Sequence, residues 1–226
     1  PEYPPIGDAA REVGFARARS PSEADAVALS SPRNPLGTSV PLEEIRGLAE
    51  AHRPVLVDQT FREFTEEPAA TRSGLEDLWL SGSYTKVYGA DELRVGYAIV
   101  PDRQVEGFGR FHGLLLDRLP ARSVSGALAI LAHRSRLLGE ARGLLRQNER
   151  YLKSRLEGVP DLAAPVWFDR GRHGLDGDRL AQRLLRKGVL VCAGSYFGDP
   201  RGVRIALTRR SFPADLDAYL AVRDRA

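Results

Sequence analysis

The segment GSYTKVYGADELRVGY (residues 82–97) holds one lysine and one arginine at a spacing that could serve chemistry. Lys86 follows a short apolar run, and Arg94 comes eight positions later. A lysine that burial keeps neutral can attack a carbonyl carbon and form a Schiff base. Arg94 could bind a phosphate through two parallel hydrogen bonds, together with the hydroxyl of Ser83. The alternative is that Lys86 is an ordinary surface lysine, as most lysines are.

Two more polar residues stand at the ends of apolar runs. Asp58 ends PVLVD (54–58), and ligands of open α/β sheets bind beyond the carboxyl ends of the strands. Its carboxylate could therefore face a positive charge on a ligand, or it could cap a helix or a turn. Asn34 lies in SSPRNPLGTS (30–39), where Asn-Pro and Leu-Gly indicate a tight turn after a strand. That turn either aims the Asn34 amide at a ligand or is a plain loop.

A further polar residue, Arg204, interrupts the apolar run GVRIALT (202–208). Successive side chains of a strand point to opposite faces, so Arg204 points away from the face that Val203 and Ile205 share. An arginine in such a place usually pairs with a carboxylate. Both an internal carboxylate and the carboxylate of a substrate remain open.

Alternating strand and helix patterns must position these residues. The apolar runs that predict strands are 27–31, 54–58, 78–83, 95–101, 164–170, 189–194 and 202–208. The segments with helical spacing are 41–53, much of 102–157, 176–188 and 213–225. This rhythm is typical of an α/β domain with a mainly parallel sheet, followed by a smaller α+β domain.

The composition is that of a soluble globular protein: 226 residues, 42% hydrophobic and 28% charged, with a net charge of +3. No apolar run approaches the roughly 18 residues of a membrane helix, so no membrane contact is predicted. The arginines are scattered. Their densest run, 133–155, has leucines at helical spacing, which favours an amphipathic helix over a nucleic-acid surface.

Cysteine and histidine suggest no further chemistry. The single cysteine, Cys192, allows no internal disulfide, which fits a reducing cytoplasm, and we expect it to be a buried apolar residue. His112, His133 and His173 are not spaced as metal ligands, and His52 is interpreted as structural. No metal site is therefore predicted.

Taken in order, five of these segments resemble the motifs of fold-type I enzymes that use pyridoxal 5′-phosphate (PLP), the class I/II aminotransferase family. That family has an Asn-Pro-x-Gly turn, a strand that ends in Asp-x-x-Tyr, a Ser-x-x-Lys motif, an arginine eight positions after the lysine, and another arginine in a late strand. The matching segments here are NPLG, VDQTF, SYTK, ELRVGY and VRIALT. The resemblance covers essentially the whole chain. It implies part of a large PLP-binding domain with a mainly parallel sheet in 1–115, linking helices in 116–157, and a small α+β domain in 158–226.

The resemblance also implies a role for each residue. Lys86 would hold PLP as a Schiff base and move the proton between the substrate α-carbon and the cofactor. Asp58 would face the pyridine nitrogen and keep it protonated, which makes the ring an electron sink. Arg204 would bind the α-carboxylate of the substrate. The other implied cofactor contacts are Asn34 to the ring oxygen O3′, Ser83 and Arg94 to the phosphate with Thr85 beside them, and Tyr3, in PEYP, stacked on the ring.

The sequence departs from the family pattern in three places. The family tyrosine is Phe61 here, which cannot donate a hydrogen bond to O3′. We expect this to raise the pKa of the Schiff base, because that donor stabilises the deprotonated imine. A family glycine is Glu92 here, which could pair with the nearby arginine or point to solvent. The chain also has no methionine, begins at Pro1 and lacks the family's N-terminal arm and glycine/hydroxyl phosphate turn, so we expect the C-terminal part of a longer enzyme or the product of a broken gene.

The predicted function is that of an aminotransferase acting on an α-amino acid and a 2-oxo acid, as a cytoplasmic homodimer. A decarboxylase, lyase or oxidase of the same fold is an alternative, since some family members with phenylalanine at the position of Phe61 oxidise amino acids with oxygen. Another alternative is a non-catalytic sensor domain, such as those fused to DNA-binding domains in some transcription regulators. The side chain of the substrate is not predicted.

Overall fold

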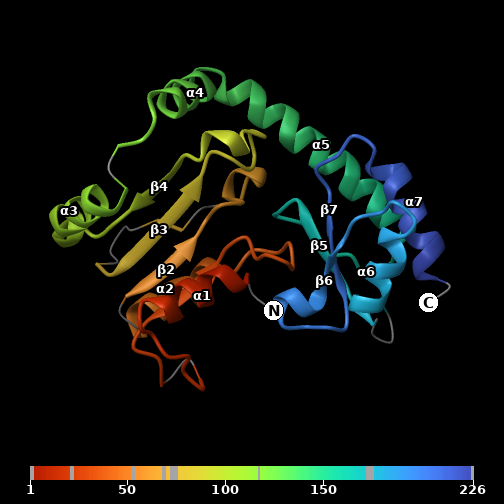
Figure 1. The fold of residues 1–226 in the computed structure, drawn as a ribbon, viewed down its shortest axis with the longest axis horizontal. Coiled ribbons are helices and arrows are strands. Elements are labelled where there is room, and N and C mark those ends of the chain that lie inside the picture. Colours follow the sequence, from red (N-terminus) through yellow and green to blue (C-terminus); the bar gives the residue numbers. More distant parts are fainter. Residues whose placement is uncertain are drawn as a thin grey trace.

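The computed structural model describes residues 3–20, 23–51, 54–67, 70–71, 76–116, 118–171 and 176–224. His52 and His173 lie outside these residues. The described residues form two sheets that a long helix connects (Figure 1). No helix among them is long and apolar enough to cross a membrane.

The first sheet has four strands in the order β1-β2-β3-β4. They are β1 (Val27–Ser30), β2 (Val55–Asp58), β3 (Leu78–Ser83) and β4 (Gly96–Ile99). β1 and β3 run parallel to β2, and β4 runs antiparallel to β3. The prediction of an α/β fold with a mainly parallel sheet is therefore confirmed. In the register, Ser30 pairs with Asp58 and Asp58 with Ser81, so the carboxyl ends of three strands meet at one edge.

One face of this sheet packs against α2 (Leu42–Ala51). Every second side chain of β2 and β3 is buried, beginning at Val55 and Leu78, because alternate side chains of a strand point to the same face. These side chains form one cluster with Ile45 and Ala49, which lie four positions apart on the same face of α2. The first sheet and its helix therefore have a hydrophobic core of their own.

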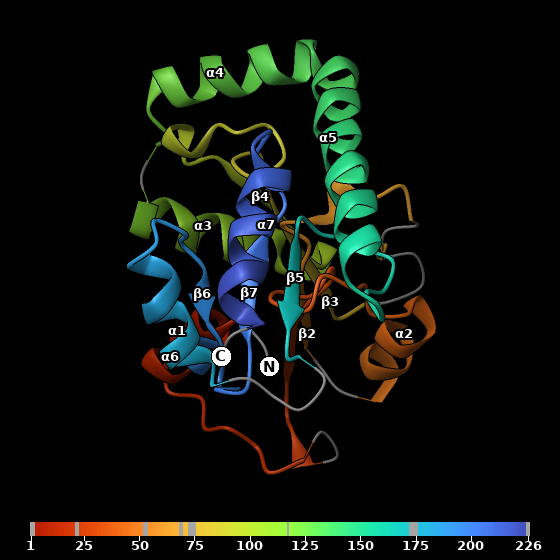
Figure 2. The same cartoon turned by 90° about the vertical axis from the view of Figure 1, so that its right-hand side faces the viewer.

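Helices follow the first sheet and lead to the second. They are α3 (Val105–Leu116), α4 (Ala121–Ala132) and α5 (Arg134–Arg155), and the short 3-10 helices before them are η2 (Arg62–Phe64), η3 (Asp91–Leu93) and η4 (Asp102–Gln104). Figures 1 and 2 show α5 extending from one sheet to the other. Leu138, Leu145 and Leu152 are buried at intervals of two helical turns, so one face of α5 packs into the core. This confirms the amphipathic helix predicted for 133–155.

The second sheet is antiparallel, in the order β5-β7-β6. Its strands are β5 (Val166–Asp169), β6 (Cys192–Ala193) and β7 (Val203–Ala206), and the helices beside them are α6 (Gly177–Leu185), η5 (Gly194–Phe197) and α7 (Phe212–Arg223). The core of this part contains Trp167 and Phe212, and it also includes Phe64 and Val87 from the first part of the chain. A continuous core thus joins the two sheets and fixes the distance between residues that are far apart in sequence.

Three details differ from the sequence-based predictions. α1 (Pro4–Glu12) was not among the predicted helices; Pro4 stands in its first turn, where the missing N–H of proline breaks no hydrogen bond. β6 is shorter than the predicted strand 189–194, because the chain turns into η5 at Gly194. A Cβ at Gly194 would lie 2.1 Å from the carbonyl oxygen of Asp199, so this turn needs glycine. Cys192 is half-buried and unpaired, whereas we expected it to be buried.

Candidate active site

Asp58 ends β2 at the edge where three strand ends meet. Its Oδ1 accepts hydrogen bonds from the Thr60 N–H at 3.0 Å, from the Thr60 hydroxyl at 2.6 Å and from the Ser81 hydroxyl at 3.3 Å. These donors fix the direction of the carboxylate. The hydrogen bonds of the described residues include none to Oδ2, and the residue is half-buried. Asp58 is therefore a turn aspartate that still has one oxygen able to accept a bond from a ligand.

Asn34 and Arg204 are brought together by the fold, although 170 positions separate them. Asn34 lies in the turn after β1, is 8% exposed, and donates its backbone N–H to the Ser30 hydroxyl at 3.3 Å. Its Oδ1 accepts a hydrogen bond from Nη1 of Arg204 at 3.0 Å. The turn therefore aims the amide oxygen at Arg204, another candidate residue, and the role of Asn34 toward a ligand stays a prediction.

Arg204 keeps an unused donor in a buried place. It lies in β7 between the buried Val203 and Ile205, with its guanidinium 5.1 Å above the ring of Phe197. Its Nε is buried and has no hydrogen-bond partner among the described residues. The ion pairs of those residues include none with Arg204, so they provide no internal carboxylate for it. A buried unpaired donor costs free energy unless a ligand satisfies it, and a carboxylate is the natural acceptor for a guanidinium.

The hydroxyls before Lys86 form a compact turn at the end of β3. The hydroxyls of Ser83 and Thr85 lie 2.6 Å apart, and the Thr85 N–H donates to the Ser83 hydroxyl at 3.1 Å. Thr85 is 5% exposed. This arrangement fixes the backbone directly before Lys86 and presents two hydroxyls at the same edge as Asp58.

Lys86 is not desolvated, although the sequence suggested that burial could keep its amine neutral and nucleophilic. Its side chain is 41% exposed, and Nζ donates to Oδ1 of Asp91 at 3.0 Å. Arg94 follows η3 with a left-handed backbone (φ 52°), which is uncommon for a residue other than glycine. Its side chain is 76% exposed, and Nη1 lies 4.0 Å from the same oxygen of Asp91. The loop thus gathers Lys86 and Arg94 around one carboxylate.

Phe61 and Tyr3 are each placed at the start of a helix. Phe61 precedes η2 and is half-buried, with its ring edge-to-face to that of Phe64 at a centroid distance of 6.1 Å. Tyr3 directly precedes α1 and is half-buried. Their roles beside a cofactor ring stay predictions.

The chemistry of these groups fits PLP. Asp58 offers a carboxylate oxygen to a protonated ring nitrogen, Lys86 an accessible amine to an aldehyde, and the hydroxyls of Ser83 and Thr85 donors to a phosphate. The unpaired Nε of Arg204 is the observation that favours a bound carboxylate most directly. Among the described residues, no three His, Cys, Asp or Glu side chains are grouped as metal ligands.

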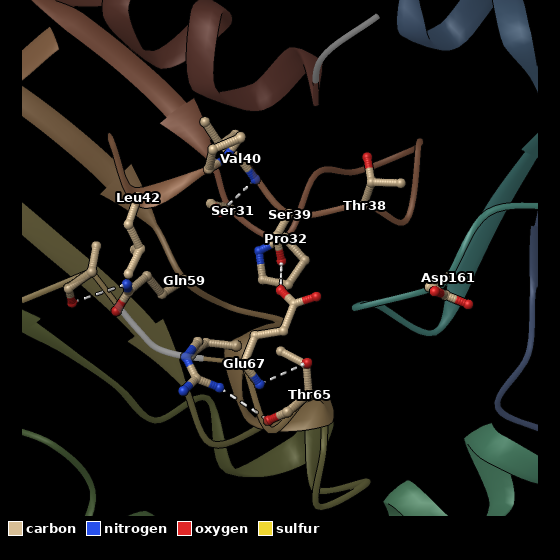
Figure 3. Close-up of a pocket in the computed structure, with 13 residues that line it drawn as sticks. Ser31, Pro32, Thr38, Ser39, Val40, Leu42, Gln59, Thr65, Glu67 and Asp161 are labelled. Atoms are coloured by element: carbon tan, nitrogen blue, oxygen red, sulfur yellow. Dashed lines mark hydrogen bonds between the residues drawn. The ribbon is translucent and has the colours of Figure 1, made fainter. Parts of the chain in front are cut away.

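A pocket of about 400 Å³ lies beside these residues but is not formed by them (Figure 3). It is lined by neighbours of Asn34 and Asp58, such as Ser31 and Gln59, and Asp161 stands across the gap. Most of its polar groups bind one another, as when Gln59 Nε2 donates to the Ala70 carbonyl at 3.3 Å. The candidate residues taken from the sequence therefore lie at the strand edge and outside this pocket.

Three contributors to the site were missed from the sequence. Thr60 orients Asp58, Phe197 supports the guanidinium of Arg204, and Asp91 pairs with Lys86. Asp-x-Thr is a known signature of a turn in which the aspartate accepts a backbone N–H two positions on, so Thr60 could have been found. Asp91 and Phe197 gave no such signal, because their contacts depend on how the loops close.

Comparison with known proteins gives a consistent result. The sequence model of the family "Aminotransferase class I and II" matches residues 14–212. A histidinol-phosphate aminotransferase of Haloferax volcanii is 30% identical over 190 residues, which cover 80% of this chain and 50% of that protein. An aspartate aminotransferase of Thermococcus kodakarensis is 29% identical over 203 residues, which cover 86% of this chain and 55% of that protein.

Solved structures share the fold of this chain. A solved structure of a probable N-succinyldiaminopimelate aminotransferase from Thermus thermophilus matches with a TM-score of 0.84 at 24% identity, over 100% of this chain and 70% of that one. The chain spans about half the length of the curated relatives it matches, with 50% and 55% of the two proteins named above covered.

Proposed function

Because the chain belongs to the class I and II aminotransferase family, we propose that it carries the reaction site of a PLP-dependent aminotransferase. The reaction would move the amino group of an α-amino acid to a 2-oxo acid. The relatives named above act on different substrates by their names, so the proposal does not extend to one particular amino acid.

The observation that carries the proposal is the contact between Arg204 and Asn34. It joins the second sheet to the strand edge of the first, and it leaves the buried Nε of Arg204 without a partner among the described residues. A substrate carboxylate on this guanidinium would be held next to the edge that bears Asp58 and the Lys86 loop. An arginine suits this task because its planar fork matches a carboxylate.

Each residue of the site would then have one task. The Lys86 amine would form the covalent link to the cofactor and afterwards carry the proton taken from the substrate α-carbon. Asp58 would accept a hydrogen bond from the ring nitrogen through its free oxygen and so hold the proton there. When bound, PLP supplies the electron sink that accepts the negative charge left at the α-carbon.

The same proposal assigns the outer contacts. Ser83, Thr85 and Arg94 would bind the phosphate, and Asn34 would hydrogen-bond the ring oxygen. Tyr3 and Phe61 would flank the ring. The hydroxyl pair of Ser83 and Thr85 supports this assignment for the phosphate, because the hydrogen bond between them fixes both hydroxyls directly before Lys86.

We include a cytoplasmic homodimer in the proposal. A single free cysteine fits a reducing compartment. The helices α3 and α4 expose large apolar side chains, among them Phe111 at 60%, Leu114 at 82% and Leu128 at 62%, which favours a partner on that side. Light scattering after size-exclusion chromatography tests this: twice the monomer mass is expected, and a monomer at micromolar concentration would contradict it.

The reaction type is tested by a half-reaction. The purified protein is loaded with PLP and mixed with single amino acids, without a 2-oxo acid. We expect pyridoxamine phosphate and the matching 2-oxo acid in equal amounts for at least one amino acid. Release of carbon dioxide or consumption of oxygen instead would indicate a decarboxylase or an oxidase. PLP binding without any turnover would indicate a sensor.

A further inference from the structure

Asp91 stands between the two basic groups that the cofactor would need. Its Oδ1 accepts the hydrogen bond from Lys86 Nζ at 3.0 Å and lies 4.0 Å from Nη1 of Arg94. Lys86 and Arg94 are its basic partners among the described residues, and the Thr85 hydroxyl is the other polar group beside it. The Asp91 carboxylate is therefore paired with both the Lys86 amine and the Arg94 guanidinium.

The backbone builds this arrangement. The Gly89 N–H donates to the Lys86 carbonyl at 3.2 Å and the Ala90 N–H to the Thr85 carbonyl at 3.0 Å, with Gly89 in the left-handed region (φ 61°). The chain thus turns back on itself directly after Lys86 and starts η3 at Asp91. The closed loop therefore brings the Asp91 carboxylate to the Lys86 amine.

Asp91 is an anion in this place. The hydrogen bond from Lys86, and then the charge of Lys86, lower the pKa of its carboxyl group, and Arg94 acts in the same direction. At neutral pH it is therefore a negative charge within reach of the groups that would hold a phosphate and an aldehyde.

From this geometry we infer that Asp91 is a positioning residue that competes with the cofactor for Lys86 and Arg94. The inference rests on the proposed function. Nζ can attack a carbonyl carbon only after it leaves Asp91, and a phosphate on Arg94 must displace or tolerate the same carboxylate. Asp91 thus slows and weakens cofactor capture, and the pair reforms when the cofactor leaves.

The neighbouring Glu92 supplies a matched control. It carries the same charge, lies in the same 3-10 helix and is exposed, yet the ion pairs and hydrogen bonds of the described residues include none with its side chain. Asp91→Asn and Glu92→Gln therefore change the net charge equally. Only the first removes the anion from Lys86. Because the pair is largely exposed, we expect effects of about two- to fivefold, the size typical of an exposed ion pair.

The first experiment measures the amine of Lys86 without any cofactor. The chain has only three lysines, and Lys187 is exposed and serves as the internal reference. Wild type, Asp91→Asn and Glu92→Gln are labelled with a trace of acetic anhydride, and the labelled peptides are quantified by mass spectrometry. The ratio of Lys86 to Lys187 labelling should rise about two- to fivefold in Asp91→Asn alone. An equal rise in both variants, or no rise, would overturn the inference.

The second experiment measures cofactor capture. The visible absorbance of the lysine Schiff base is followed after mixing the three proteins with PLP or with pyridoxal, which lacks the phosphate. Asp91→Asn should capture PLP faster and more tightly than Glu92→Gln, and the gain with pyridoxal should be smaller because the Arg94 contact is not needed. Equal capture by both variants would contradict the competition.

The two failures can be told apart. If none of the three proteins forms a Schiff base, the proposed function is wrong, and the labelling ratio still decides whether Asp91 restrains Lys86. If wild type forms the Schiff base and Asp91→Asn behaves as Glu92→Gln does, the function stands and the role of Asp91 is refuted.

Discussion

Asp58 and Asp169 end strands of similar pattern, PVLVD and PVWFD, yet the structure gives them opposite surroundings. Asp169 is 2% exposed, and both its oxygens are taken. Oδ2 accepts from the Tyr219 hydroxyl and from Nε of Arg223, each at 2.6 Å, and Oδ1 accepts from the Gly171 N–H at 2.7 Å. Asp58 is half-buried, and its bonds within the described residues all go to one oxygen.

The difference shows that burial of a charge does not by itself mark a functional site. The Asp169 group is the more buried of the two, but its members satisfy one another and leave no capacity for a ligand. The candidate site residues Asp58 and Arg204 differ from this. Within the described part of the chain, Asp58 keeps an oxygen without a hydrogen bond and Arg204 keeps an unpaired Nε. For these two aspartates, unused hydrogen-bonding capacity, and not the charge, distinguishes the candidate site from the structural network.

The strongest test of the difference between the candidate site and the structural Asp169 network is the removal of the Lys86 side chain. Lys86→Ala should abolish the covalent link to PLP and lower turnover by at least about 10²- to 10⁴-fold, the usual contribution of a positioned acid–base group. The melting temperature should change little, because an exposed ion pair contributes about 0–1 kcal/mol. Absorbance spectra and steady-state kinetics measure the loss of the covalent link and of turnover, and thermal melts measure the melting temperature. If Lys86→Ala lost stability as well as activity, Lys86 would have a structural role, and the contrast with the Asp169 network would be wrong.

Asp169 should behave in the opposite way. Asp169→Asn leaves Arg223 without its buried partner, and breaking such a pair typically costs about 3–5 kcal/mol of unfolding free energy. Denaturant unfolding measures the loss, with Asp8→Asn as the control, since Asp8 pairs with Arg11 at the exposed surface. The folded variant should still form the Schiff base with PLP. Loss of cofactor binding in folded protein would refute a purely structural role.

The two arginines provide a finer comparison. Arg204→Lys should raise the KM for the amino acid about 10- to 100-fold, because a hydrogen bond to a charged group contributes about 1.5–3 kcal/mol and lysine cannot form the bidentate pair. Arg223→Lys should lower the melting temperature and leave KM unchanged. If Arg223→Lys raised KM and Arg204→Lys only lowered the melting temperature, the assignment of Arg204 to the substrate and of Arg223 to the structural network would be wrong.

The structural network also predicts a pH dependence. Burial, and then the charge of Asp169, raise the pKa of Tyr219 above its ordinary value of 10.0. Above pH 10 the unfolded chain loses this proton and the folded protein keeps it, so the contribution of Tyr219 to the free energy of unfolding is constant below pH 10 and falls above it. The slope is about 1.4 kcal/mol per pH unit for one such group. Tyr219→Phe should reduce the slope by that amount, and an unchanged slope would contradict the prediction.

The smallest expected effect concerns Phe61. In Phe61→Tyr the new hydroxyl could donate to the ring oxygen, stabilise the deprotonated Schiff base and lower its pKa. Phe64→Tyr, nearby in η2, is the control, because Phe64 belongs to the hydrophobic core. A spectroscopic pH titration compares the three proteins. Identical titrations of wild type and Phe61→Tyr would contradict the placement of Phe61 beside the ring.

The local parts of the fold could be predicted from the sequence. Apolar runs predicted β1, β2, β3 and β7, and the strand ends predicted where Asp58 would lie, because these patterns depend on near neighbours. The contact between Asn34 and Arg204 could not be derived from spacing, since it needs both sheets to be docked through one core. The motif resemblance suggested the site residues but not their partners.

Three features show what the sequence could not supply. PVLVD and PVWFD have the same apolar pattern ending in aspartate, and what distinguishes the two aspartates is the contact of Asp169 with Tyr219 and Arg223, at least 50 positions away. The exposure of Lys86 and its pairing with Asp91 depend on the closure of one loop. β6 ends early because of a close backbone approach at Gly194 that no residue pattern encodes.

We propose Lys86 as the residue that binds the cofactor covalently. The most direct measurement is borohydride reduction of the PLP-loaded protein, followed by digestion and mass spectrometry of the three lysine peptides. We expect a phosphopyridoxyl group on Lys86 and none on Lys153, which is paired with Glu149 and Asp161, or on the exposed Lys187. Equal labelling of the three lysines, or no label at saturating PLP, would contradict it.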